Sequence, residues 1–159
     1  MKSKQKLLIL IIGLSMISIV GAFFFQFNLG ILPCELCLLQ RWPHYIGVTI
    51  AVIALVFSTR ATIIIFFGSS NSLVGVILSI YHSGIERAIW KGLSSCSGLN
   101  DISGMSTKEL LNKILDTPVT KCNEISWSFL GFSLANINLL VFIIIFCSWL
   151  KIFINDQKL

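Results

Sequence analysis

Residues 7–34 read LLILIIGLSMISIVGAFFFQFNLGILPC and hold no charged side chain over 28 positions. A helix needs about 20 apolar residues, within a range of roughly 17–25, to cross the hydrocarbon core of a bilayer. This stretch therefore predicts a membrane-spanning helix at residues 7–27. Because Phe23, Phe24 and Phe25 continue the apolar run, we expect it to be a retained span rather than a cleaved signal peptide.

Three further uncharged runs cover residues 42–59, 61–85 and 125–150, and they predict spans at 42–58, 62–81 and 127–150. Charged residues make up 12% of the 159 and hydrophobic ones 55%, whereas soluble proteins average roughly 25% charged. This composition excludes a disordered tail, a fibrous protein and a soluble enzyme. Since only helices or closed barrels satisfy the backbone in lipid, we expect an all-α integral membrane four-helix bundle, with residues 1–159 as one domain.

The net charge of +5 follows the predicted spans rather than a nucleic-acid face. Basic residues near span ends mark the cytoplasmic side. The segments at the termini and between the second and third spans carry six of them against Asp156: Lys2, Lys4, Lys6, Arg60, Lys151 and Lys158. We therefore expect both termini inside, loops 28–41 and 82–126 outside, membrane lipid as a partner, and no nucleic acid.

The second outer loop contains a helix signal. Ser106 and Glu109 form a capping box, and the apolar residues behind it fall on one helical face before Pro118: Leu110, Leu111, Ile114 and Leu115. We expect a short helix here, which either lies in the membrane interface or packs on top of the bundle.

Four of the five cysteines lie in the outer loops: Cys34 and Cys37 in the first, Cys96 and Cys122 in the second. In an oxidising compartment such cysteines are paired or redox-active. A C-x-x-C at a helix start brings two sulfurs together and favours a thiolate, the species that attacks a disulfide. The alternatives are half of a zinc site and a purely structural disulfide, and all three pairings of four cysteines are possible.

Cys96 and Cys122 bracket 25 residues. A loop-closing disulfide is one interpretation, worth roughly 3 kcal/mol of loop entropy. Beside a second pair on the same side of the membrane, disulfide exchange between the two pairs is the better interpretation. Cys147, inside the last span, is expected to behave as a small hydrophobic residue without a role.

Arg41 lies four residues after Cys37, at the edge of an apolar span. It either extends its charge to the interface without further function or donates hydrogen bonds to a polar ligand held at the membrane surface. His82, Glu86 and Trp90 share a face if their helix continues. Glu86 is then expected to pair with Arg87 or Arg41.

These residues resemble DsbB-type disulfide bond formation proteins of the bacterial inner membrane. The resemblance covers nearly the whole chain, and its specific parts are the first motif and the Cys96/Cys122 pair. The matching stretches are Pro33-Cys34-Glu35-Leu36-Cys37-Leu38-Leu39-Gln40-Arg41, Tyr81-His82-Ser83-Gly84-Ile85-Glu86, the spaced Cys96 and Cys122, and Trp127-Ser128-Phe129-Leu130-Gly131-Phe132-Ser133.

The resemblance implies an oxidase that passes two electrons from a soluble periplasmic DsbA-like thioredoxin-fold protein to the membrane quinone pool, ubiquinone or menaquinone. It implies that the partner attacks Cys96, that the released Cys122 attacks Cys34, and that Cys37 is left as a thiolate facing the quinone. Arg41 looks like the quinone-contacting residue and His82 like a second contact.

Two other classes compete with this interpretation. A vitamin K epoxide reductase-like enzyme also combines a helical bundle with a C-x-x-C, although its motif would be expected nearer the last spans. A non-enzymatic membrane protein that binds metal through soft thiolates belongs to a different class. A further alternative is a structural membrane subunit whose disulfides only brace the loops.

Overall fold

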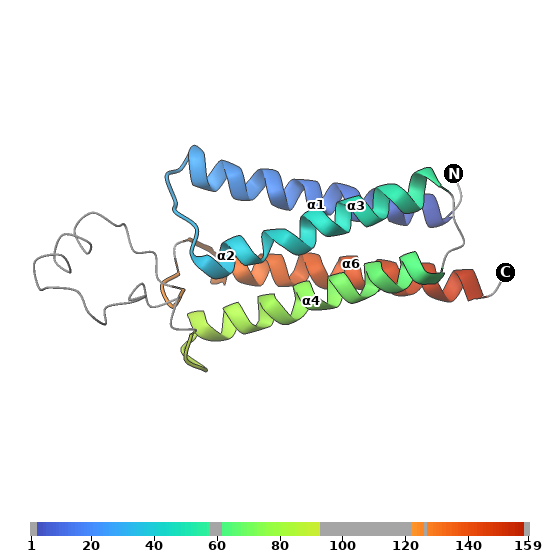
Figure 1. Ribbon diagram of the computed structural model, residues 1–159. Coiled ribbons are helices and arrows are strands. Elements are labelled where there is room, and N and C mark those ends of the chain that lie inside the picture. The colour runs from blue at the N-terminus through green and yellow to red at the C-terminus, as the bar shows by residue number, and fades with distance from the viewer. Residues whose placement is uncertain (1–2, 58–61, 93–121, 126, 158–159) are drawn as a thin grey trace, which may run out of the picture.

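The computed structural model describes residues 3–57, 62–92, 122–125 and 127–157. Four long helices lie side by side in a bundle: α1 (Ser3–Phe27), α3 (Arg41–Val56), α4 (Thr62–Glu86) and α6 (Leu134–Gln157). The short helix α2 (Glu35–Leu39) precedes α3. In Figure 1, α2 lies at the end of the bundle opposite the start of α1 and the end of α6.

Three helices are long and apolar enough to cross a membrane: Ser3–Phe27, Thr62–Glu86 and Leu134–Asp156. The all-α membrane fold is confirmed at this level, and the chain is a multi-pass membrane protein. The helix α3 has 16 residues, just under the usual spanning length, so the fourth span stays a prediction. Many outward-facing side chains are apolar and exposed, including Ile17, Val56 and Phe66, as a lipid-facing surface requires.

The predicted start of the last span is wrong. Residues 128–133 instead form a small antiparallel hairpin of β1 (Ser128–Phe129) and β2 (Phe132–Ser133). Both turn residues have positive φ, 51° at Leu130 and 82° at Gly131, a conformation that glycine adopts without strain. The Ser133 side chain then accepts the Asn136 N–H, as an N-cap residue does, and α6 begins after it.

The helix α4 also runs five residues beyond its predicted end, to Glu86. It packs closely on α6 because small residues face large rings. A Cβ at Gly68 would meet the Trp149 ring at 2.5 Å, and Gly75 lies in the same way against Phe142. Trp149 and Phe142 are fully buried in the resulting core.

Candidate functional site

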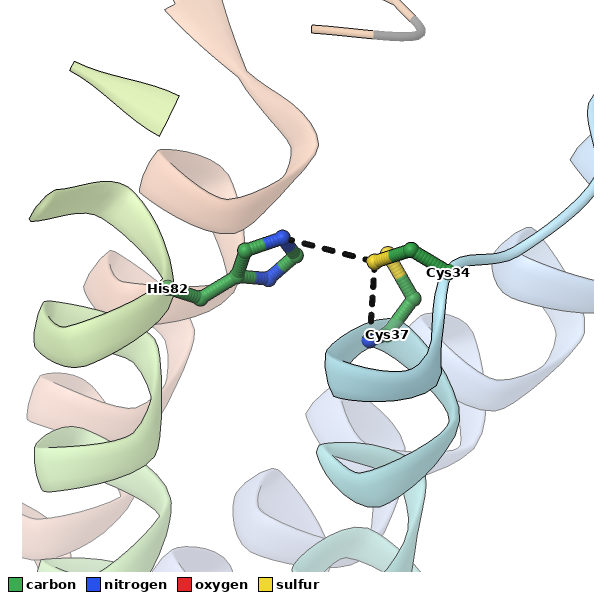
Figure 2. A group of neighbouring side chains, drawn as sticks. All are labelled: Cys34, Cys37 and His82. Atoms are coloured by element: carbon green, nitrogen blue, oxygen red, sulfur yellow. Dashed lines mark hydrogen bonds between the residues drawn. The ribbon is translucent and has the colours of Figure 1, made fainter. Parts of the chain in front are cut away.

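Cys34 and Cys37 meet at the start of α2, as the C-x-x-C spacing predicts. Cys34 is the N-cap residue, and its Sγ accepts the Cys37 backbone N–H at 3.3 Å. The helix therefore begins at Glu35, directly after Cys34. The two sulfurs lie 3.0 Å apart and both cysteines are free thiols. Figure 2 shows both sulfurs turned toward α4.

His82 on α4 completes the group, with its Nε2 3.5 Å from the Cys34 Sγ. The pKa of Cys34 is lowered to about 4, first by the hydrogen bond from the Cys37 thiol and then by His82, against burial that raises it. The pKa of Cys37 is raised because it donates to that thiolate and is buried itself. The reduced pair therefore holds one proton on Cys37 and one negative charge on Cys34.

The ring of His82 is oriented by Gln40. The Gln40 side-chain nitrogen donates to the Leu78 carbonyl at 3.3 Å and contacts the His82 Nδ1 at 3.1 Å. Since a carbonyl only accepts, this end of the Gln40 amide must be its NH₂ group. The His82 Nδ1 is then the acceptor, and its Nε2 carries the hydrogen that points at Cys34. Gln40 thus fixes the tautomer that favours a Cys34 thiolate.

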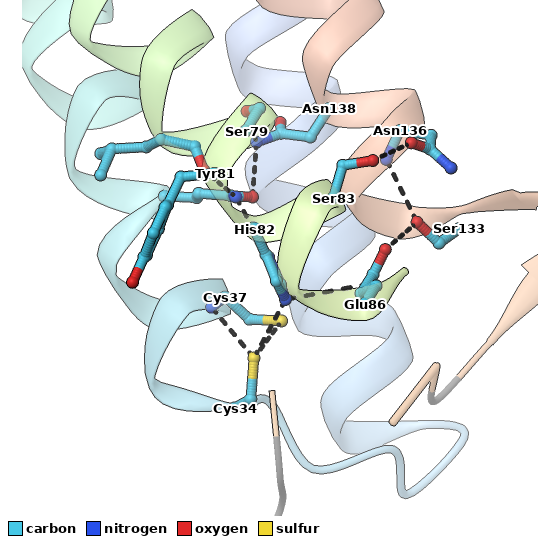
Figure 3. Close-up of polar contacts among 12 residues, drawn as sticks. Cys34, Cys37, Ser79, Tyr81, His82, Ser83, Glu86, Ser133, Asn136 and Asn138 are labelled. Atoms are coloured by element: carbon cyan, nitrogen blue, oxygen red, sulfur yellow. Dashed lines mark hydrogen bonds and ion pairs between the residues drawn. The ribbon is translucent and has the colours of Figure 1, made fainter. Parts of the chain in front are cut away.

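Glu86 does not pair with Arg41 or Arg87 as the sequence suggested. In the described part of the chain it lies 3.9 Å from the His82 Nε2 and accepts a hydrogen bond from Ser133 (Figure 3). Within the same group of contacts, Ser83 donates to Asn136. The start of α6 therefore holds Glu86 beside His82.

The shared face of His82, Glu86 and Trp90 is also wrong, because α4 ends at Glu86. Ala88 has a φ of 54°, and the chain turns back. The Trp90 indole then stacks on Tyr81, with ring centroids 6.1 Å apart, and donates to the Tyr81 carbonyl.

A cavity of about 310 Å³ lies against the cysteine pair. Its walls come from α1, α2, α3, α4, α6 and the segment before α2, and most of its lining is apolar, including Ala22, Phe25 and Val141. The site residues that line it are Cys34, Cys37, Gln40, Arg41, His82 and Glu86. A mostly apolar cavity with a few polar groups is typical of a small-molecule site.

Arg41 reaches this cavity from the first turn of α3. Its Nη1 donates to Gln26 on α1 at 2.9 Å, and its guanidinium lies 5.0 Å from the centre of the Phe23 ring. Its Nε is buried and has no hydrogen-bond partner among the described residues. The cavity thus combines a mostly apolar lining, a donor held in place and a thiolate.

Cys122 is fully buried and disulfide-bonded. It belongs to the same buried cluster as Cys34, Leu36 and Ile85. The four-cysteine zinc site is therefore excluded in this redox state. Cys96 and the expected helix behind Ser106 lie outside the described residues.

The donor atoms of Cys34, Cys37 and His82 lie within 4.8 Å of one another, which would also suit a soft metal ion. Cys147 is exposed on α6 and free.

Sequence reasoning missed Gln40, His44 and Asn138. The ring of His44 contacts Asn138, whose amide contacts Gln40, and all three line the cavity. His44 lies inside the predicted span 42–58, and an ionisable residue at that depth is a signal of function. The role of Gln40 and Asn138 depends on helix packing, which the local pattern does not show.

Comparison with known proteins shows which family this chain matches. The family model of disulfide bond formation protein DsbB matches residues 4–152. An uncharacterized protein of Rickettsia prowazekii is 28% identical over 142 residues, covering 88% of this chain and 83% of that protein. Disulfide bond formation protein B of Pasteurella multocida is 25% identical over 150 residues, covering 86% and 78%. The protein of that name from Psychrobacter cryohalolentis is 28% identical over 136 residues, covering 82% and 77%. No solved structure matches.

Proposed function

The chain belongs to the DsbB family of disulfide bond formation proteins, which are membrane oxidoreductases, and we propose that it passes two electrons from a periplasmic DsbA-like protein to a membrane quinone. The observation that carries this proposal is the convergence of Cys34, Cys37, Arg41 and His82 on one apolar cavity. The family match favours this function over the vitamin K epoxide reductase-like alternative.

The first half of the reaction is disulfide exchange. A thiolate of the reduced partner attacks Cys96 in a Cys96–Cys122 disulfide, and the released Cys122 attacks Cys34 and opens its bond to Cys37. The second partner thiol closes the partner's disulfide and frees Cys96. Cys96 then re-forms its bond to Cys122 and releases Cys34. The burial of Cys122 in one cluster with Cys34 supports a direct exchange between them.

The second half re-forms the Cys34–Cys37 disulfide. The quinone would supply the oxidising equivalent. The thiolate and the thiol give up two electrons and one proton as their disulfide forms, and the second proton of the quinol comes from solvent. In the fully reduced pair, Cys34 rather than Cys37 holds the electron pair as a thiolate, which differs from the expectation drawn from the resemblance. His82 stabilises this thiolate through Nε2–H, and Cys37 holds one proton. Arg41 would hold a ring oxygen through its unpaired Nε. Ubiquinone and menaquinone both fit this description.

We further propose that residues 1–159 form one domain in the bacterial inner membrane with four spans, both termini cytoplasmic and the cysteines periplasmic. Cys34 and Cys37 lie at the start of α2, and α2 lies at the end of the bundle opposite the start of α1 and the end of α6 (Figure 1), which supports this arrangement. Segment 28–34 and α2 would then lie at the periplasmic surface, where a soluble partner has access.

The test is quinone reduction by the detergent-solubilised chain with a reduced DsbA-like protein. The unaltered chain and Cys147→Ser should both reduce quinone, whereas Cys37→Ser and Cys96→Ser should not. If Cys37→Ser and Cys96→Ser both still reduce quinone, that result contradicts the proposed electron path.

A metal-binding function is the second candidate, because Cys34, Cys37 and His82 form a three-donor group. Elemental analysis of the purified chain decides between them. Stoichiometric zinc that blocks alkylation of both cysteines favours the metal function, and metal-free chain that reduces quinone favours the oxidase.

A further inference from the structure

His44 carries an unpaired buried atom that the mechanism above does not use. Its Nδ1 and the Nε of Arg41 are the two buried polar atoms on cavity-lining residues that have no hydrogen-bond partner in the described part of the chain. Leaving such a group unpaired in the interior destabilises the fold. Unpaired groups in native proteins therefore call for a bound water, ion or ligand.

The ring of His44 is fixed on its other sides. It is 3% exposed and stacks on Phe142, with ring centroids 4.2 Å apart and planes at 21°. Its Nε2 lies 2.9 Å from the Oδ1 of Asn138. Nδ1 is the ring nitrogen left without a partner among the described residues, on a side chain that lines the cavity.

The Leu78 carbonyl decides which ring nitrogen of His44 carries hydrogen. That carbonyl requires the NH₂ of Gln40, so the Gln40 oxygen faces Asn138 and accepts its Nδ2–H at 2.9 Å. The Asn138 oxygen must then face His44. Because that oxygen only accepts, the His44 Nε2 donates to it.

The second nitrogen is then a bare acceptor in the neutral ring. Among the described residues, no ion pair involves His44. A charged imidazole buried without a counter-charge is unfavourable, so the ring is neutral. Its Nδ1 presents a lone pair and no hydrogen.

We propose that the Nδ1 of His44 accepts a hydrogen bond from a ring hydroxyl of the quinol and thereby binds the quinol in preference to the quinone. A quinol hydroxyl has a hydrogen to donate to the lone pair, whereas a quinone carbonyl offers only lone pairs of its own. This inference rests on the proposed function and deepens it. It assigns the ligand a second polar contact, in which His44 accepts a hydrogen bond whereas Arg41 donates one.

The preference has a redox consequence. A hydrogen bond to a buried, otherwise unpaired acceptor changes affinity by about tenfold. Tenfold tighter binding of the reduced form raises the two-electron potential of the bound quinone by about 30 mV. His44 would thereby draw electrons from the Cys34–Cys37 pair toward the ring.

The experiment measures binding without electron transfer. The full-length chain carrying Cys34→Ser and Cys37→Ser is placed in lipid nanodiscs, and a short-chain benzoquinone and its quinol are titrated separately under anaerobic conditions by calorimetry. His44→Phe removes both nitrogens but keeps a ring against Phe142. Ser72→Ala is the matched control. Ser72 is buried on α4, its hydroxyl donates to the Gly68 and Ser69 carbonyls of its own helix, and it does not line the cavity.

The proposal predicts that the quinol binds more tightly than the quinone, that His44→Phe weakens the quinol about tenfold and the quinone little, and that Ser72→Ala leaves both unchanged. Equal loss for both ligands, or no loss, overturns the role of His44 while leaving the quinone function standing. If neither ligand binds the parent chain, the proposed function and this inference both fail. His44→Gln is a second variant that keeps a hydrogen-bond acceptor at this position, in case His44→Phe fails to fold. It should bind the quinol more tightly than His44→Phe does and less tightly than the parent chain.

Discussion

The Nε2 of His82 lies 3.5 Å from the Sγ of Cys34, across 48 residues of sequence and between two different helices. The contact ties α4 to the start of α2. It puts a fixed N–H donor on the sulfur whose charge is also stabilised by the Cys37 thiol and backbone N–H. The first prediction concerns this sulfur.

Cys34 should be a thiolate throughout the neutral range in the reduced chain. Because its pKa is lowered to about 4, its alkylation rate should be nearly flat from pH 5 to pH 8 and fall only as pH drops through about 4. Cys37 should resist alkylation over the same range, since its pKa is raised. Iodoacetamide labelling followed by mass spectrometry measures both rates.

The control for that profile is Cys34→Ser. It removes the thiolate that raises the Cys37 pKa, so Cys37 should become reactive at lower pH than in the parent chain. An ordinary thiol profile at Cys34, rising toward pH 9, contradicts the account.

His82→Phe should raise the Cys34 pKa, because it removes a donor to the thiolate. A hydrogen bond to a charged group is worth about 1.5–3 kcal/mol, so alkylation at the acid end of the profile should slow about tenfold. Gln40→Leu should act in the same direction but less, since it only frees the tautomer of His82. A Cys34 profile unchanged by His82→Phe rules out this contact as a cause.

How much of this site the sequence predicts depends on the range of each contact. Local spacing predicts that the C-x-x-C lies at a helix start. The resemblance predicts that Arg41 and His82 belong to the same site. The predicted contacts of Glu86 were wrong because its actual partners, His82 and Ser133, depend on where α4 ends and α6 begins. The predicted start of the span at 127–150 was wrong because the apolar run continues through the Leu130-Gly131 turn. Hydropathy does not depend on backbone conformation, so it gives no sign of that turn.

Arg41→Met should weaken quinone binding without changing the Cys34 pKa profile. It removes the unpaired Nε at the cavity, and the loss of a charge-assisted hydrogen bond corresponds to at least about tenfold in affinity. Arg87→Met is the matched control, because Arg87 is exposed beyond the end of α4 and does not line the cavity. Equal effects of the two variants on the quinone KM would show that only the net charge matters.

Gly68→Ala should destabilise the bundle. The added Cβ would meet the Trp149 ring at 2.5 Å, and overpacking of a core costs about 1–3 kcal/mol. Gly13→Ala is the control, since nothing lies within 4 Å of its added Cβ, and removing a helical glycine stabilises by up to about 1 kcal/mol. Unfolding in detergent mixtures compares the two, and a stable Gly68→Ala variant contradicts the close packing of α4 on α6.

The central claim is that electrons from a partner dithiol leave through the Cys34–Cys37 pair to a quinone. The most direct measurement is an anaerobic count of partner disulfides formed and quinol produced by the unaltered chain in the same sample. We predict one quinol for each partner disulfide over many turnovers. Partner oxidation that stops after one or two disulfides per chain, with no quinol formed, would contradict the claim.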